Sequence, residues 1–159
     1  MFTLLTVCTG NSTRSIIAEA ILRREAEGRF AVASAGSNPV GRVHPATYRL
    51  LDRKGLPSRG FRSKSWREFA PPEGDRPDLI LFLCPAAEAE LSVAWPRGPM
   101  STLWEIEEPA AAQNDLAFDL AYIRLARRIE ALLSDPIEDM TRDNRRWRLD
   151  RIAETGGEL

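Results

Sequence analysis

The strongest constraint on this sequence is a short apolar segment that ends in a cysteine and a polar loop, directly before a helical pattern. Residues 2–7 read FTLLTV, a short and mostly apolar run that predicts a buried strand. From Ser15 to about Glu27 apolar residues recur at helical spacing, and Gly28 ends the run. A buried strand followed by a loop and a helix is typical of α/β proteins.

The rest of the chain repeats this alternation of strands and helices. Apolar runs predict further strands at residues 30–33, 79–83 and 101–104, and helical spacing predicts helices at residues 45–54, 86–93 and 115–133. Such alternation implies right-handed crossovers and a parallel sheet with helices on both faces. We therefore expect an α/β fold, a single-domain three-layer αβα sandwich with a sheet of about four parallel strands. Ligands of such sheets bind beyond the carboxyl ends of the strands.

The C-terminal third of the chain carries two amphipathic patterns. In the helix of residues 115–133, the apolar residues on or near one face, which should pack against the body, are Leu116, Leu120, Ile123, Ile129 and Leu132. After Ser134 the chain turns polar and charged, and a last short helix should pack onto the body through Trp147, Leu149 and Ile152. We treat residues 134–159 as a polar segment of one domain that spans residues 1–159.

Composition excludes several classes of protein. The longest apolar run, residues 79–87, has 9 residues and falls well short of the ~20 that a membrane helix needs, so we expect no membrane partner. The N-terminus lacks a basic stretch before its apolar start, so we expect no secretory signal and a cytoplasmic location. Two cysteines and one histidine make a poor zinc set, so we expect no metal.

The net charge of −1 hides an asymmetry between two parts of the chain. Residues 1–64 carry a net charge of +7, and residues 65–159 carry −8. A basic part suggests an anionic ligand, although two solvated faces of opposite sign would give the same charges. The basic residues are scattered and not interleaved with aromatic residues, so we expect no nucleic acid as a partner.

The loop after the first strand has the composition of an oxyanion site. It reads Cys8-Thr9-Gly10-Asn11-Ser12-Thr13-Arg14-Ser15 and leads directly into the helix. Five residues between the cysteine and the arginine suffice to wrap a tetrahedral oxyanion with backbone N–H groups, and the helix N-terminus adds partial positive charge. Arg14 would bind two oxygens with its planar guanidinium. The ligand would therefore be held by Thr9, Gly10, Asn11, Ser12, Thr13 and Arg14.

The same loop offers a nucleophile. The positive field should lower the pKa of Cys8 well below the free value of ~8.5, because the thiolate is the form that attacks. Ser15 would donate a hydrogen bond to the sulfur. Gly10 would allow a positive φ angle, and Asn11 would brace the loop through its side-chain amide. A structural cysteine beside a helix cap is the alternative, but strand, nucleophile, arginine and helix all occur in register.

These residues resemble a known family. The stretch VCTGNSTRSIIAEAIL (residues 7–22) looks like the nucleophile loop and first helix of low-molecular-weight tyrosine phosphatases and of the arsenate reductases with the same fold. Ser34-Ala35-Gly36 resembles the family's SAG motif, which implies that Ser34 supports the loop and the bound oxyanion. Four segments resemble bacterial arsenate reductases: SAGSNPVGRVHP (34–45), FRSKSW (61–66), AWPRGPMSTLW (94–104) and RRWRLDRI (145–152).

The resemblance implies a general acid in a loop over the site, where family members place Asp-Pro. The matching residues here are Glu108-Pro109, so a glutamate replaces the aspartate and reaches about 1.5 Å further. Glu108 would protonate the leaving oxygen as Cys8 attacks. An acidic surface loop is the alternative explanation for three glutamates in four positions.

The resemblance also implies a redox role for Cys84, which follows the strand of residues 79–83. Thioredoxin-linked reductases carry a second redox cysteine there and pass the disulfide to a third, which is Ser92 here when the sequences are registered on Trp95-Pro96. Serine cannot exchange disulfides, so a Cys8–Cys84 disulfide would need thioredoxin, a glutaredoxin-like partner or a small thiol as its direct reductant; the alternative is that reductase activity is lost. A buried structural role for Cys84 stays open.

From the sequence we favour arsenate reduction, with Cys8 as the nucleophile and Cys84 as the resolving thiol. Hydrolysis of a phosphorylated substrate through a phosphocysteine is the alternative, since it uses the same loop and needs no second thiol. A module that binds an oxyanion or a partner with little turnover is a third hypothesis. None of these calls for a metal or an organic cofactor, and only the reductase needs an external thiol.

Overall fold

The computed structural model of the chain describes residues 1–95 and 98–158. Within these residues the strands are β1 (Phe2–Cys8), β2 (Phe30–Gly36), β3 (Leu79–Phe82) and β4 (Met100–Leu103). They form one sheet in the order β2-β1-β3-β4, with every neighbouring pair parallel, so the expected α/β sheet is confirmed. Pro96 and Arg97, part of the segment that resembles arsenate reductases, and Leu159, the last residue of the polar segment, lie outside the described residues.

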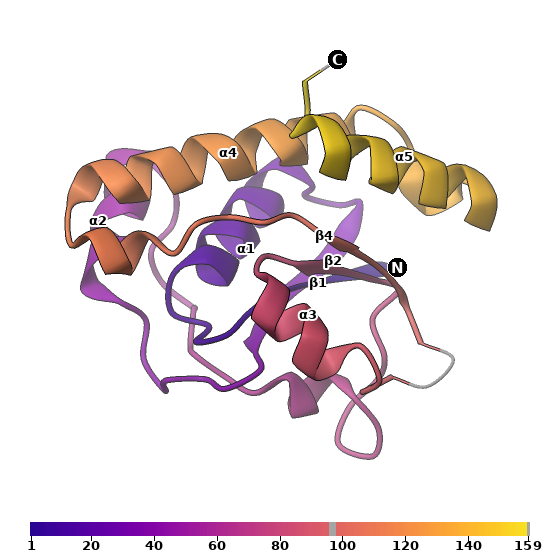
Figure 1. The fold of residues 1–159 in the computed structure, drawn as a ribbon, viewed down its shortest axis with the longest axis horizontal. Helices are drawn as coiled ribbons and strands as arrows, with labels where there is room; N and C mark the ends of the chain where they lie inside the picture. The colour runs from indigo at the N-terminus through magenta and orange to yellow at the C-terminus, as the bar shows by residue number, and fades with distance from the viewer. Residues whose placement is uncertain (96–97, 159) are drawn as a thin grey trace.

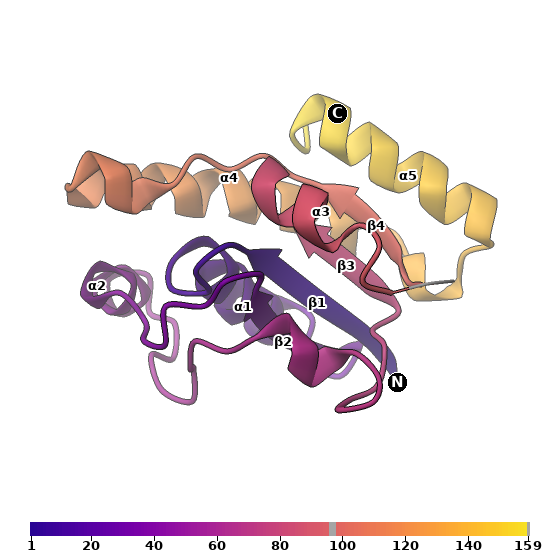
Figure 2. The ribbon, with the colours of Figure 1, turned by 60° about the horizontal axis from the view of Figure 1, so that its bottom comes forward.

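Helices connect the strands and cover the sheet. They are α1 (Arg14–Glu25), α2 (Pro45–Arg53), α3 (Pro85–Leu91), α4 (Asp115–Leu133) and α5 (Arg142–Thr155), with short 3-10 turns η1 (Trp66–Phe69), η2 (Pro109–Ala112) and η3 (Ile137–Asp139). α1, α4 and α5 lie on one face of the sheet and α3 on the other (Figures 1 and 2). No helix in the described part of the chain is both long and apolar enough to cross a membrane.

The two central strands position the site. β3 is buried along its whole length, and β1 is buried from Leu4 to Cys8, as expected for strands with helices on both faces. Val7 of β1 pairs with Phe82 of β3, so the two strands end side by side. The loop that follows β1 and the residue Cys84 that follows β3 therefore emerge at the same edge of the sheet.

The expected core face of α4 is only partly correct. Leu116, Leu120 and Ile123 are 66%, 42% and 46% exposed. The buried apolar stripe instead consists of Phe118, Ala121, Leu125, Ile129 and Leu132. Apolar residues surround most of this helix, and packing against α1 selects the stripe with the aromatic side chain.

The polar C-terminal segment also differs from expectation. α5 has 14 residues and is not a short helix. Leu149 and Ile152 are buried as expected, but Trp147 is 63% exposed, so its predicted packing onto the body is wrong. Leu149 and Ile152, three positions apart, bury one face of the helix against the body, and Trp147 lies outside that face.

Candidate active site

The loop between β1 and α1 turns its carbonyl oxygens outward. The backbone N–H groups of residues 37, 38 and 40, which follow β2, donate to the carbonyl oxygens of Cys8, Thr9 and Gly10 over 2.9–3.0 Å. The backbone N–H groups of Asn11 and Ser15 point the other way and bond to the Cys8 sulfur. Outward carbonyls and inward amides at a helix N-terminus are the arrangement that an anion nest requires, and anion binding by Thr9–Arg14 stays a prediction.

Two backbone features impose this shape. Gly36, the glycine of the SAG segment, has no room for a side chain, because a Cβ there would lie 2.5 Å from the carbonyl oxygen of Thr9. Asn11 adopts a φ of 47°, in the left-handed region that asparagine tolerates better than most residues. The expectation that Gly10 takes the positive φ angle is therefore wrong; the next residue takes it.

Asn11 braces the loop through its amide, as expected. Its Nδ2 donates to Ser15 Oγ over 2.8 Å and to Ser34 Oγ over 2.9 Å, and its Oδ1 accepts from the backbone N–H of Lys64 over 2.9 Å. Ser34 is fully buried and bonds to Asn11 and Glu19, so it supports the loop from behind. Its predicted support of the loop is thus seen directly, while its predicted contact with the oxyanion stays a prediction.

Cys8 is 1% exposed, and its sulfur lies 3.0 Å from Ser15 Oγ. Because Ser15 Oγ already accepts from Asn11, its own proton is free to point at the sulfur. Burial raises the pKa of the Cys8 thiol, whereas the Ser15 hydrogen bond and the Arg14 charge lower it. Burial is the largest of these effects, so the expected fall in the pKa of Cys8 is wrong.

The fold brings Glu108 across 94 positions of sequence to the loop. Its Oε2 lies 3.1 Å from the guanidinium of Arg14, and its Oε1 accepts from Thr13 Oγ1 over 2.8 Å. Arg14 also donates to the carbonyl oxygen of Ile106 over 3.0 Å. The candidate acid and the anion-binding arginine are thus already paired.

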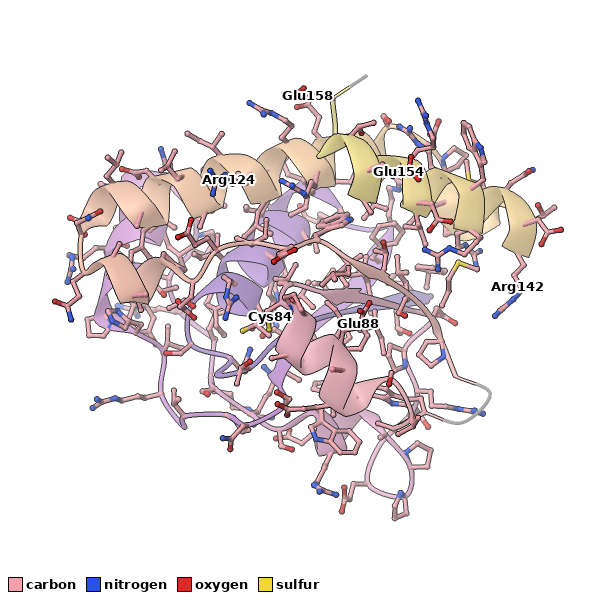
Figure 3. The ribbon with its side chains drawn as sticks, viewed as in Figure 1. Cys84, Glu88, Arg124, Arg142, Glu154 and Glu158 are labelled. Atoms are coloured by element: carbon pink, nitrogen blue, oxygen red, sulfur yellow. The ribbon has the colours of Figure 1, made fainter. Side chains whose placement is uncertain are left out.

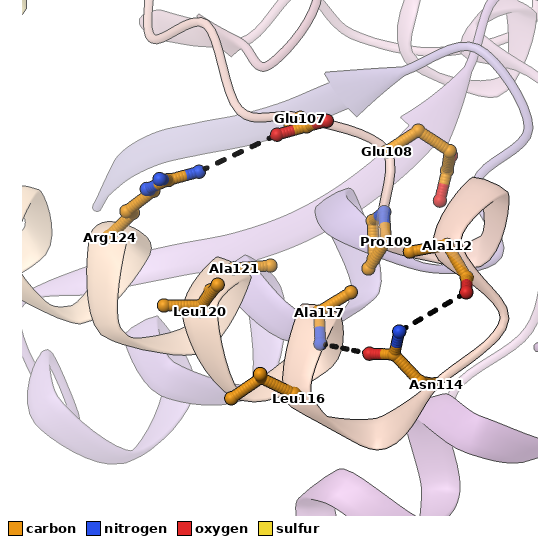
Figure 4. Close-up of a pocket in the computed structure, with 10 residues that line it drawn as sticks. All are labelled: Glu107, Glu108, Pro109, Ala112, Asn114, Leu116, Ala117, Leu120, Ala121 and Arg124. Atoms are coloured by element: carbon orange, nitrogen blue, oxygen red, sulfur yellow. Dashed lines mark hydrogen bonds and ion pairs between the residues drawn. The ribbon is translucent and has the colours of Figure 1, made fainter.

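The acid loop, residues 105–109, also borders a groove, which Glu107 and Glu108 both help to line. Glu107 and Glu108 leave the loop in opposite directions, Glu107 toward Arg124 on α4, 4.0 Å away, and Glu108 away from it (Figure 4). The groove between this loop and α4 has a volume of about 220 Å³, and the exposed side chains of Leu116 and Leu120 help to line it. Only Glu108 of the neighbouring glutamates reaches the loop after β1.

Cys84 caps the N-terminus of α3 at the same edge of the sheet (Figure 3). Its Sγ lies 3.4 Å from Thr9 Oγ1, and both cysteines are free and buried. The β1–β3 register pairs Val7 with Phe82, so Cys84 lies level with Thr9, one residue beyond Cys8. Ser92 lies at the opposite end of α3 and is exposed, so a thiol there would stand about 12 Å along the helix from Cys84.

Sequence reasoning missed two charged residues behind the loop. Glu19 is 1% exposed on α1, and the Lys64 side chain is 8% exposed beside it. The available signal was a glutamate within the apolar run IIAEAIL, four residues after Ser15 and hence on the same helix face. His44 caps α2, since its Nδ1 accepts a hydrogen bond from the backbone N–H of Ala46.

A buried cysteine in an anion nest at the carboxyl edge of a parallel sheet defines a class, the cysteine-dependent oxyanion enzymes. Residues 3–146 match the low molecular weight phosphotyrosine protein phosphatase family, and the chain belongs to that family. A glutaredoxin arsenate reductase from Synechocystis sp. is 27% identical over 128 residues, which cover 80% of this chain and 93% of the relative.

Solved structures show the same two branches. An arsenate reductase in the phosphate binding state is 25% identical, with a TM-score of 0.70 over 84% of this chain and 98% of that chain. The tyrosine phosphatase Wzb from Escherichia coli K30, in complex with sulphate, is 26% identical, with a TM-score of 0.63 over 80% of this chain and 93% of that chain. The resemblance inferred from the loop is confirmed.

Proposed function

We propose that this protein reduces arsenate, with Cys8 as the nucleophile and Cys84 as the second thiol. The observation that carries the proposal is the pair of free cysteines at the ends of adjacent strands, joined through Thr9. A glutaredoxin arsenate reductase among the relatives supports it. Cys8 and Cys84 together can supply the two electrons that conversion of As(V) to As(III) requires.

The loop residues would hold the arsenate oxygens. Among the described residues Arg14 Nε is buried without a hydrogen-bond partner, and leaving such a donor unpaired costs about 1–3 kcal/mol. An oxyanion oxygen in the nest would satisfy this donor. The ligand would also compete with Glu108 for the Arg14 guanidinium, because both are anionic.

The chemistry balances in two steps. In the first, the Cys8 thiol condenses with HAsO₄²⁻ to give a Cys8–S–AsO₃²⁻ adduct, and the thiol proton leaves with an arsenate oxygen as water. In the second, Cys84 attacks the Cys8 sulfur, so the S–As bond breaks and its electron pair stays on arsenic. The products are a Cys8–Cys84 disulfide and arsenite, which takes up the Cys84 proton.

An external thiol would then reduce the disulfide. Ser92 offers no thiol for an internal relay, so the reductant must reach the Cys8–Cys84 bond itself. The Synechocystis relative is a glutaredoxin arsenate reductase, which supports a glutaredoxin-like partner here, with thioredoxin or a small thiol such as glutathione as the alternatives.

The test is arsenite formation from arsenate with glutathione alone, glutathione plus glutaredoxin, and a thioredoxin system. Wild type should turn over with at least one reductant, and Cys84→Ser should lose at least ~100-fold. Ser92→Ala, a change at the exposed far end of α3, is the matched control and should keep the wild-type rate. No arsenite with any reductant, or equal rates in wild type and Cys84→Ser, would reject the two-cysteine reductase.

Hydrolysis of phosphate monoesters is the second candidate, and the position of Glu108 favours it. Its contacts with Thr13 and Arg14 keep the Glu108 carboxyl group beside the loop that would hold the phosphate, and in its protonated form it would donate to the leaving oxygen. Hydrolysis would proceed through a phosphocysteine on Cys8, which water then attacks. An aryl phosphate assay on the same preparations distinguishes the two, since Cys84→Ser should spare hydrolysis.

A further inference from the structure

Glu19 is a buried charge that no step of the chemistry uses. It lies on α1, four residues after Ser15, and fully buried glutamates are rare unless they are paired. Its carboxylate forms an ion pair with Arg23, and Lys64 Nζ lies 3.9 Å away. Glu19 lies behind Ser34 and Asn11, so its influence on the nucleophile must pass through other side chains.

A chain of hydrogen bonds runs from this carboxylate to the Cys8 sulfur. Ser34 Oγ donates to Glu19, Asn11 Nδ2 donates to both Ser34 and Ser15, and Ser15 lies 3.0 Å from the sulfur. Every member is buried. In a low-dielectric interior such a network is sensitive to the loss of any one partner.

The carboxylate sets the direction of this chain. A carboxylate paired with two cations accepts hydrogen bonds only, so the single proton of Ser34 must point at Glu19. Ser34 Oγ must then accept, which requires the NH₂ side of the Asn11 amide to face it. The second N–H of Asn11 donates to Ser15, and the Ser15 proton is left for the sulfur.

Lys64 fixes the same amide from the other side. Its backbone N–H donates to Asn11 Oδ1 over 2.9 Å, its carbonyl oxygen accepts from Gly36, and its Nζ donates to Ser34 over 3.4 Å. An inverted Asn11 amide would place its NH₂ against the Lys64 N–H, donor against donor. Lys64 and Glu19 therefore demand one orientation of Asn11.

We propose that Glu19 and Lys64 are positioning residues that fix the Ser15 hydrogen bond to the Cys8 sulfur. The bond stabilises negative charge on sulfur, which develops when Cys8 attacks and when it leaves an adduct. The proposal deepens the proposed function, since it needs Cys8 as the reactive thiol, but it does not depend on which oxyanion is the substrate.

The experiment is alkylation of Cys8 by iodoacetamide as a function of pH, with the Cys8 and Cys84 peptides quantified separately by mass spectrometry. In Glu19→Gln and Ser34→Ala the midpoint for Cys8 should rise by about one pH unit, equivalent to roughly tenfold slower alkylation below it. Ser15→Ala should give at least as large a rise. Adding Glu19→Gln to Ser15→Ala should change nothing further, because the two act through one bond.

The control variants are chosen from the charged groups around the Glu19–Lys64 pair. Those that face the Glu19–Lys64 pair are Arg23 on α1, Arg62 in the segment before η1, and Glu68 on η1, which pairs with Arg62; Arg14 is the charged group beside Cys8. Glu25→Gln removes an exposed carboxylate from the same helix and should leave the midpoint unchanged. Should Glu19→Gln fail to fold in a thermal melt, Ser34→Ala breaks the same chain without removing a charge.

A wild-type midpoint in folded Glu19→Gln or Ser34→Ala, combined with a shifted one in Ser15→Ala, would overturn the proposal. Glu19 would then serve stability alone. Because the readout is alkylation and not turnover, a protein that forms no arsenite would still test the positioning role. Failure of the arsenate assay and failure of the positioning role are thus told apart.

Discussion

The two cysteines lie at the ends of adjacent strands, yet their surroundings differ. Cys8 receives backbone hydrogen bonds from Asn11 and Ser15 and lies beside the Ser15 hydroxyl. Among the described residues Cys84 Sγ has one polar neighbour, Thr9 Oγ1, and it caps α3 without a side-chain hydrogen bond to the helix. These environments are the ones that the proposed roles require, because a nucleophile must be fixed relative to its oxyanion, whereas a resolving thiol must move to the nucleophile.

The largest expected effect is the loss of activity when Cys8, the first of the two cysteines, is replaced. Cys8→Ser should abolish arsenate reduction and aryl phosphate hydrolysis alike, by at least ~10⁴-fold, because both begin with attack by the same sulfur. Cys84→Ser, assayed in parallel, should lose reduction only. Hydrolysis that survived in Cys8→Ser would show that Cys8 is not the nucleophile.

Glu108→Gln should slow the chemistry at Cys8 without affecting thiol exchange between Cys8 and Cys84. Loss of a general acid typically costs ~10²–10⁴-fold, so kcat for aryl phosphates should fall by at least ~100-fold. The rate at which an added oxidant such as diamide joins Cys8 to Cys84 should not change, because thiol exchange uses no carboxylate.

The same variant has a binding consequence with the opposite sign. Removing the anion from Arg14 should tighten competitive inhibition by inorganic phosphate about threefold, since the ligand no longer displaces a charged partner. Unchanged kcat together with unchanged inhibition would assign Glu108 to the solvated surface of its loop.

Gly36→Ala should disturb the loop around Cys8 through its backbone. The added Cβ would lie 2.5 Å from Thr9 O, so the loop or β2 must shift, at a cost of about 1–3 kcal/mol in the free energy of unfolding. Gly10→Ala is the matched control for stability, because its Cβ would meet nothing nearer than Val40 Cγ1 at 3.4 Å, an ordinary van der Waals contact. Denaturant unfolding measures both, and equal losses would contradict the close approach.

The smallest effect is a pH dependence of stability caused by Cys8. Its pKa is raised in the folded protein, so above about pH 8.5 the unfolded chain loses the thiol proton while the folded chain keeps it. The folded state then binds more protons, and the free energy of unfolding falls as pH rises, by up to about 1.4 kcal/mol per pH unit.

Cys8→Ser removes that titration. Its stability should therefore decline less steeply than that of wild type between pH 8.5 and 10, whereas the two curves should run parallel below pH 8. Denaturant titrations at each pH measure the difference. Parallel curves across the whole range would show that burial does not hold the proton on Cys8.

Much of this protein was readable from sequence because its signals are local. The strand, the Cys8–Ser15 loop and the helix follow each other within 25 residues, and the helix Asp115–Leu133 has the bounds that its apolar spacing predicts. The helix predicted for residues 45–54 does begin at Pro45, directly after its cap His44. In each case backbone propensity and neighbouring residues suffice to specify the element.

Tertiary packing decided what depends on residues far apart in the chain. Helix α4 carries more apolar residues than one face holds, so its own sequence does not specify the buried stripe. Packing against α1 decides which stripe is buried. The pairing of Arg14 with Glu108 and of Glu19 with Lys64 depends on the strand order and on loops 45 and 94 residues away. The pKa of Cys8 rose because folding removed water from the thiol, an effect that no local motif displays.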